Sequence, residues 1–207
     1  LRLWQHDLMG GPMNDYHRYV RAGKFEEMWK ECDDPWNEKG ECYEASPCSI
    51  ATKYLIRAQD QVTTCSLGSG LGRHLDWLNV SGCGVELSET AYRTAAFLYP
   101  WLTFEHANIV SFMRTNTMTF PNFLFREILW YILPDWAEVV DILKTKHQGA
   151  LAIVELSFYD NQKYGLDYFN GPDDFIAKWP FTIEKIVREH TTKQQREGRL
   201  MIAGRVP

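Results

Sequence analysis

The chain of 207 residues lacks long hydrophobic stretches and clusters of basic residues. Its longest purely apolar run, Ile128 to Leu133, is far shorter than the roughly 20 residues that a membrane-spanning helix needs. The first residues contain no signal-peptide hydrophobic core. Lys and Arg together number 22 against 27 Asp and Glu, so the formal net charge is −5, whereas nucleic-acid-binding proteins carry a clustered basic face. We therefore expect a cytoplasmic protein that binds neither membranes nor nucleic acid.

Cysteine is scarce and irregularly placed. The five cysteines are an odd number and form no Cys-x-x-Cys pair, whereas disulfide scaffolds carry an even, dense set. Cys32, Cys42 and Cys48 are separated by ten and six positions, which fits no zinc-ligand pattern. The thiols are therefore predicted to be buried or incidental, and no metal site is expected.

The chain does contain enough apolar residues for a sizeable core, at 45% apolar and 14% aromatic. Its length fits one large domain or one domain with an extension. Near residue 60 the composition changes: charged and aromatic residues are interleaved before it, and short apolar runs alternate with helix-period segments after it. We expect a helical, aromatic N-terminal cap over residues 1–59 and a main domain over residues 60–207, as a monomer or homodimer.

The main domain is predicted to alternate strands and helices. Residues 150–156 form a nearly continuous apolar run, which is typical of a strand buried on both faces of a sheet. Ser88 is placed to cap a helix, and Pro134 and Asp135 to open another. Such alternation indicates a doubly wound α/β fold with a mostly parallel sheet, in which the short connection between the last two strands predicts an antiparallel pair. The seven predicted strands are 61–67, 83–87, 102–106, 123–125, 150–156, 181–191 and 199–206.

A glycine-rich loop follows the first predicted strand. Residues 66–72 read SLGSGLG, and glycines at a strand-to-helix junction let the backbone approach a ligand closely. Arg73 occupies the position where a dinucleotide fingerprint needs a small residue, and the Gly-Lys-Ser/Thr ending of a phosphate-binding loop is absent. Glu86 ends the second predicted strand, where a carboxylate can bind a ribose diol. A ribose with a phosphate-free polar tail fits both features; a plain glycine turn and an exposed strand-end acid are the simpler alternatives.

Four segments in this order resemble the class I S-adenosylmethionine-dependent methyltransferases, which have a Rossmann-like fold. They are the glycine loop, residues 84–88, residues 107–109 and residues 126–133. The loop departs from the family pattern at Ser66, where the family usually has Asp or Glu. The resemblance implies S-adenosylmethionine as cofactor, with the loop at its methionine end, Glu86 at the ribose and Asn108 with Ile109 at the adenine. The cofactor-binding residues implied in this way are Leu67, Gly68, Ser69, Gly70, Gly72, Glu86, Leu87, Asn108, Ile109 and Arg126.

The N-terminal part is similar to one subgroup, the NodS-like nodulation methyltransferases. It contains Asp34-Pro35-Trp36 and Tyr43-Glu44 ahead of the glycine loop, and Glu127-Ile-Leu-Trp-Tyr follows the fourth predicted strand. NodS-like enzymes methylate an amine on a sugar. The resemblance therefore implies a small-molecule acceptor.

Methyl transfer to an amine or hydroxyl requires alignment of the acceptor and removal of a proton. Glu127 and Tyr131 are the predicted catalytic residues, and Trp36, Tyr43, Tyr131 and Tyr159 the predicted substrate contacts. Asp160, His17 and His106 are further candidate bases, whereas His74 is expected on the outer face of the first helix. A lid or an ordinary helical flank would equally explain the aromatic N-terminal residues Trp4, Tyr16, His17, Tyr19, Trp29, Trp36 and Tyr43.

The expected function is transfer of a methyl group from S-adenosylmethionine to an amine or hydroxyl of a small molecule such as a sugar or secondary metabolite. A non-catalytic protein that keeps the cofactor fold is the alternative, motivated by Ser66. An oxidoreductase using nicotinamide is disfavoured by Arg73. A protein or nucleic-acid methyltransferase is a further alternative. The absence of a basic face and of an Asn-Pro-Pro-aromatic motif disfavours the nucleic-acid form.

Overall fold

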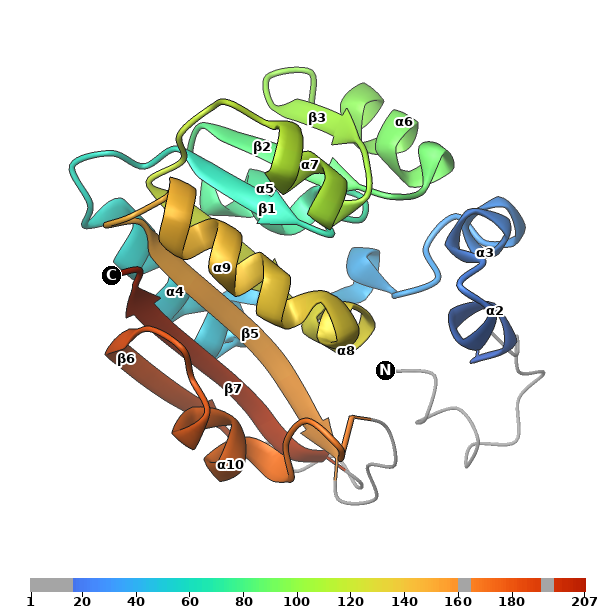
Figure 1. The fold of residues 1–207 in the computed structure, drawn as a ribbon. Helices are drawn as coiled ribbons and strands as arrows, with labels where there is room; N and C mark the ends of the chain where they lie inside the picture. Colours follow the sequence, from blue (N-terminus) through green and yellow to red (C-terminus); the bar gives the residue numbers. More distant parts are fainter. Residues whose placement is uncertain (1–16, 160–164, 191–195) are drawn as a thin grey trace.

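A seven-stranded sheet forms the centre of the computed structural model, which describes residues 17–159, 165–190 and 196–207 (Figure 1). The strand order is β3-β2-β1-β4-β5-β7-β6. The first five strands are mutually parallel, whereas β7 runs antiparallel to both β5 and β6. This confirms the predicted doubly wound sheet with a reversed last pair. The strands are β1 (Thr64–Leu67), β2 (Gly82–Glu86), β3 (Thr103–His106), β4 (Asn122–Arg126), β5 (Leu151–Tyr159), β6 (Thr182–Glu189) and β7 (Arg196–Arg205).

Helices connect the strands and cover both faces of the sheet (Figure 1). The hydroxyl of Ser88 accepts a hydrogen bond from the backbone N–H of Ala91, which confirms it as an N-cap. The α-helices are α2 (His17–Ala22), α3 (Phe25–Glu31), α4 (Pro47–Arg57), α5 (Arg73–Leu78), α6 (Glu89–Leu98), α7 (Ile109–Thr115), α8 (Leu129–Ile132), α9 (Trp136–Lys146) and α10 (Gly171–Ala177), with short 3-10 turns η1 (Glu38–Gly40), η2 (Tyr43–Ala45) and η3 (Leu133–Asp135).

Side chains of β5 divide the core between the two faces. All nine residues of this strand are buried. Ala152 and Val154 belong to the larger apolar cluster under α7, α8, α9 and α10. Leu151 and Ile153 belong to a second cluster with residues of α4 and α5. Because successive side chains of a strand point to opposite faces, one apolar run supplies both layers.

The N-terminal segment has two structural roles. Cys48 and Ile56 of α4 are fully buried against the sheet, so this helix is part of the main core although it lies in the predicted cap. Met28 and Trp29 of α3 instead pack with Leu71 of the glycine loop and with Ala91 of α6. Of the described residues, those from 17 to about 45 therefore form the part that covers the loop, and a domain division at residues 59/60 remains a prediction.

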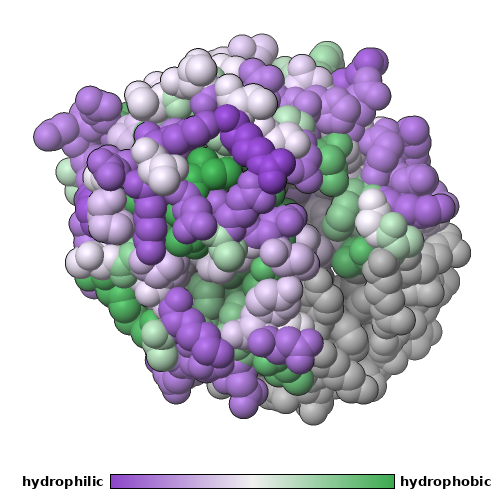
Figure 2. Space-filling model, viewed as in Figure 1, coloured by the Kyte–Doolittle hydropathy of each residue, from purple (hydrophilic) through white to green (hydrophobic). Residues whose placement is uncertain are grey.

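Polar side chains dominate the face of the molecule shown in Figure 2, with smaller apolar patches between them. Within the described ranges, no helix combines the length and apolar character that crossing a membrane requires. The five cysteines are free thiols, and Cys48, Cys65 and Cys83 are buried, as expected from their spacing.

Candidate cofactor and acceptor site

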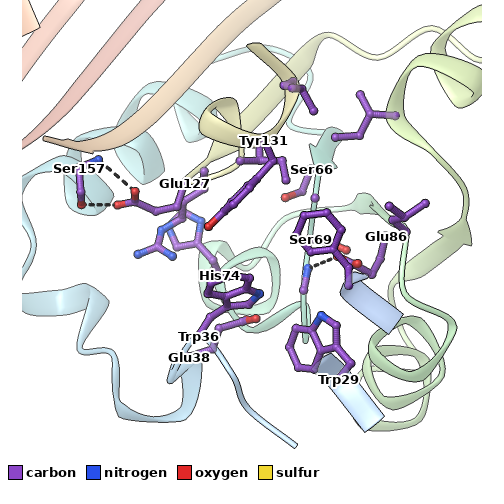
Figure 3. Close-up of a pocket in the computed structure, with 18 of the residues that line it drawn as sticks. Trp29, Trp36, Glu38, Ser66, Ser69, His74, Glu86, Glu127, Tyr131 and Ser157 are labelled. Carbon is purple, nitrogen blue, oxygen red and sulfur yellow. Dashed lines mark hydrogen bonds between the residues drawn. The ribbon is translucent and has the colours of Figure 1, made fainter. Parts of the chain in front are cut away.

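The candidate site is a cavity of about 370 Å³ at the carboxyl ends of the parallel strands. Ligands of open α/β sheets bind at this edge, and the volume suits a small-molecule ligand. The glycine loop after β1, the ends of β2 and β4, β5 and the segment 23–41 all contribute to its lining. Figure 3 shows side chains from these elements facing a common space.

At two positions of the loop, only glycine fits both the backbone conformation and the close approach of neighbouring side chains. Gly68 and Gly70 have φ angles of 70° and 55°, in the left-handed region that side chains other than glycine seldom adopt. A Cβ atom at Gly68 would lie 2.4 Å from Cγ1 of Ile128, and one at Gly70 would lie 2.1 Å from a carboxylate oxygen of Glu38. The loop is therefore shaped to let neighbouring groups approach its backbone.

Glu86 holds the loop in place. Its two carboxylate oxygens accept hydrogen bonds from the backbone N–H groups of Gly70 and Ser88, each at 2.9 Å. Burial raises the pKa of Glu86, while these hydrogen bonds favour its ionised form. The predicted ribose-binding carboxylate thus lines the cavity at the end of β2.

Asn108 and Ile109 lie at the neighbouring strand end. The side-chain oxygen of Asn108 caps α7 by accepting hydrogen bonds from the N–H groups of Val110 and Ser111 at 3.0 and 3.2 Å. Ile109 is buried and, like Asn108 and Leu87, lines the cavity. A polar amide beside apolar side chains is an arrangement that can hold a flat heterocycle.

A network of arginines and carboxylates forms the opposite wall. Arg126 forms ion pairs with Glu41, which comes from the segment preceding α4, and with Glu155 on β5. Arg199 on β7 forms ion pairs with the same Glu41 and with Glu127. Side chains of Arg126 and Arg199 are only 12% and 7% exposed. Glu41 therefore joins the N-terminal segment to two separate strands of the sheet.

Glu127 is held tightly within this network. Its carboxylate accepts hydrogen bonds from the backbone N–H and the hydroxyl of Ser157 at 3.0 and 2.6 Å (Figure 3). It also accepts a hydrogen bond from Nε of Arg199 at 3.0 Å. The residue has a φ of 54°, and such strained backbone in non-glycine residues is enriched at functional sites. These three donors fix the orientation of the Glu127 carboxylate.

Aromatic side chains from the cap pack around Tyr131. The ring of Tyr131 lies 5.6 Å from that of Phe25 and 5.7 Å from that of Trp36. Figure 3 shows Tyr131 extending between the side of the cavity with Glu127 and the side with Ser69 and Glu86. Trp29, Trp36 and Tyr159 also line the cavity. The aromatic N-terminal segment thus covers the site, as a lid would.

His74 differs from its predicted position. It is buried at 6% exposure and lines the cavity instead of facing solvent from α5. Its ring stacks on Trp77, and its Nε2 lies 3.7 Å from the carboxylate of Glu155. Burial lowers the pKa of His74 well below its usual value, so the imidazole is neutral at pH 7. The prediction of an outer-face histidine was wrong because the surface of α5 that it occupies is covered by Tyr43 and the sheet.

Three other predicted residues lie outside the cavity lining. Tyr43 is buried with its ring 4.8 Å from that of His74 and beneath the guanidinium of Arg126, so its placement does not support direct substrate contact. Leu67 and Gly72 do not line the cavity themselves, although the loop residues between them, Gly68, Ser69 and Gly70, do. The predicted residues that the cavity does bring together are Trp36, Gly68, Ser69, Gly70, Glu86, Leu87, Asn108, Ile109, Arg126, Glu127, Tyr131 and Tyr159.

Sequence patterns missed a second set of lining residues. Most come from segments far apart in the chain, and no local motif indicates that they meet. His106, a candidate base, is exposed and pairs with the backbone oxygen of Leu87 at 3.0 Å. Asp160, Trp4, Tyr16 and the side chain of His17 lie outside the described residues. The lining residues not predicted as site residues are Gly23, Phe25, Glu38, Glu41, His74, Ile128, Ile132, Asp135, Ser157 and Arg199, together with Trp29, expected only in a lid or flank, and Ser66, expected only as part of the loop.

Metal binding has no candidate in the part of the chain that the structure describes. There, no three His, Cys, Asp or Glu side chains are grouped so that they could hold a metal ion.

Comparisons with known proteins relate the chain to solved structures only. No family model and no curated protein matches it. N-methyltransferase NodS from Bradyrhizobium japonicum WM9, in complex with S-adenosyl-L-homocysteine, superposes with a TM-score of 0.65 at 14% identity, covering 89% of this chain and 97% of NodS. The chain has the Rossmann-like methyltransferase fold. The family resemblance is thereby confirmed at the level of the fold.

Other structures with this methyltransferase fold carry different activities in their names. Magnesium protoporphyrin IX methyltransferase from Synechocystis PCC 6803, with bound S-adenosylmethionine, gives a TM-score of 0.53 at 13% identity, covering 98% of this chain and 89% of that chain. The [4+2]-cyclase SpnF superposes with a TM-score of 0.62 at 10% identity, covering 89% of this chain and 96% of the SpnF chain. Because one fold carries both names, the reaction has to be argued from the site.

Proposed function

We propose that the protein is an S-adenosylmethionine-dependent methyltransferase that acts on an amine or hydroxyl of a small molecule, such as a sugar or secondary metabolite. One observation carries this proposal: a single cavity connects the glycine loop, Glu86 and Asn108 with Glu127 and Tyr131. A cofactor at the first group of residues would therefore share an enclosed space with an acceptor at the second.

The residues present fit this cofactor. Gly68 and Gly70 carry no side chain, so neighbouring groups approach the loop backbone closely, and Glu86 offers a buried carboxylate for the ribose hydroxyls. Asn108, Ile109 and Leu87 would hold the adenine. The cofactor supplies an electrophilic methyl group on a positively charged sulfur. NodS, which shares the fold, was crystallised with the corresponding product S-adenosyl-L-homocysteine.

The charge of the lining favours a positively charged ligand. Five acidic residues line the cavity, against Arg126 and Arg199. Both arginines are paired with two of these acids, Glu41 and Glu127, so three lining acids remain beyond these ion pairs. The acidic residues are Glu38, Glu41, Glu86, Glu127 and Asp135. Opposite charge attracts ligands into a low-dielectric cleft. We therefore favour an amine over an anionic acceptor.

The chain's own residues would align the acceptor and exclude water. Phe25 and Trp36 pack on Tyr131 and cover the acceptor side, and well-oriented reactants can gain several kcal/mol from such positioning. Glu127, or Tyr131 in its phenolate form, would receive the acceptor's proton, a contribution of roughly 10²–10⁴ in rate.

Transfer of label from methyl-labelled S-adenosylmethionine to a panel of small amines and alcohols, amino sugars first, tests the proposed activity. The expected result is labelled product together with equimolar S-adenosylhomocysteine, only when an acceptor is present. Tight binding of the cofactor without labelled product across the panel would favour the alternative, a protein that binds the cofactor without methyl transfer. Ser66 in the loop and the cyclase SpnF among proteins of this fold are the reasons to keep that alternative.

A further inference from the structure

The cap places a carboxylate directly on the glycine loop. Glu38 lies in η1, and its Oε1 accepts a hydrogen bond from the backbone N–H of Leu71 at 3.0 Å. The same oxygen lies so close to Gly70 that a Cβ there would be 2.1 Å away. Glu38 lines the cavity beside the loop (Figure 3). This carboxylate comes from a residue that lies 33 positions before Leu71 in the chain.

Glu38 is held in this position by the residues before it. The carboxylate of Asp34 accepts hydrogen bonds from the backbone N–H groups of Glu38 and Lys39 at 2.7 and 2.8 Å. These bonds fix the start of the 3-10 turn η1. Asp34 belongs to the Asp-Pro-Trp segment noted in the sequence, which therefore positions Glu38 as well as Trp36.

Glu38 has no ion-pair partner among the described residues, although it is partly buried. The backbone N–H of Leu71 and the charge of Arg126 favour its ionised form, but the guanidinium of Arg126 is paired with Glu41 and Glu155. Asp34 and Glu86 face Glu38 and repel it, and burial raises the pKa of Glu38 to about 8. A buried charge without a counter-ion destabilises a fold, so this position suits a carboxylate that receives its counter-ion from a ligand.

Ser66 supplies no negative charge at the start of the glycine loop. It is buried and lines the cavity, and a neutral hydroxyl cannot balance a positive charge. We propose that Glu38 is the counter-charge for the α-ammonium group of the cofactor, supplied by the cap in place of an acid at Ser66. This inference rests on the proposed cofactor.

Two ligands that differ in the amino-acid tail test the inference. S-adenosylhomocysteine carries the α-ammonium group, whereas 5′-methylthioadenosine lacks it. For Glu38→Gln, the expected result in calorimetry is an affinity for S-adenosylhomocysteine about 10- to 100-fold lower, the effect of losing a hydrogen bond to a charged group. The affinity for 5′-methylthioadenosine should stay within about twofold. Glu27→Gln, an exposed acid of the same cap, is the matched control and should leave both affinities unchanged.

Several outcomes would overturn the inference. An equal loss for both ligands would show that Glu38 only supports the loop. Tighter binding of S-adenosylhomocysteine to Glu38→Gln would show that the carboxylate blocks the site. If wild-type protein bound neither ligand while remaining folded, the proposed cofactor would be refuted, and this result differs from any effect confined to Glu38.

Discussion

Glu38 makes a quantitative prediction about stability in the absence of ligand. Its pKa rises from an ordinary 4.5 to about 8 in the folded protein. Between these pH values the folded protein keeps a proton that the unfolded chain releases, so the contribution of Glu38 to the free energy of unfolding falls as pH rises. Glu38→Gln removes this dependence because a neutral amide stands in for the protonated carboxyl.

The pKa shift sets the size of the effect. Each pH unit corresponds to about 1.4 kcal/mol, so the full window gives an upper limit of about 5 kcal/mol at pH 8 and above. Glu38 remains in contact with solvent in the cavity, which screens its charge. We therefore expect Glu38→Gln to be more stable than wild type by about 1–3 kcal/mol at pH 8.

Urea unfolding at several pH values between 4.5 and 8.5 measures this difference. The stability gained by Glu38→Gln should be close to zero at the lowest pH and should grow steadily toward pH 8. Glu27→Gln should follow wild type throughout. A constant difference between Glu38→Gln and wild type at every pH, or a loss of stability that grows with pH, would refute the reasoning, because either result would mean that Glu38 is charged without cost in the folded protein.

Two further substitutions test other parts of the site. Glu86→Ala should weaken binding of S-adenosylhomocysteine by roughly 1–3 kcal/mol through lost charge-assisted hydrogen bonds; unchanged affinity in calorimetry would remove Glu86 from the ribose role. Glu41→Ala should lower the free energy of unfolding by about 3 kcal/mol, because Arg126 and Arg199 would lose a shared buried partner. A urea midpoint equal to that of wild type would show that these ion pairs contribute nothing to stability.

The sheet was predictable because each strand is indicated by a short stretch of the sequence itself. The apolar run 150–156 indicated β5, and it is buried throughout. The short connection before β7 indicated the antiparallel pair. The glycine loop and Glu86 were found for the same reason, since each lies at the end of its own strand and parallel strands bring such ends to one edge.

The other half of the site depends on contacts that sequence spacing does not reveal. Glu41 meets Arg199 across 158 positions, and neither residue belongs to a recognisable motif. The predicted exposure of His74 was wrong, and the predicted substrate contact of Tyr43 is not supported by its position. In both cases the burial of the side chain is decided by a neighbouring element. Each covers the other within a cluster that includes Trp77, so the exposure of either depends on a contact between η2 and α5.

Cofactor identity is the central claim, and calorimetry with S-adenosylhomocysteine beside NADH tests it most directly. We predict micromolar binding of S-adenosylhomocysteine, about −8 kcal/mol, and no binding of NADH, because Arg73 replaces the small residue of a dinucleotide loop. Binding of NADH alone, or of neither ligand to folded protein, would contradict it.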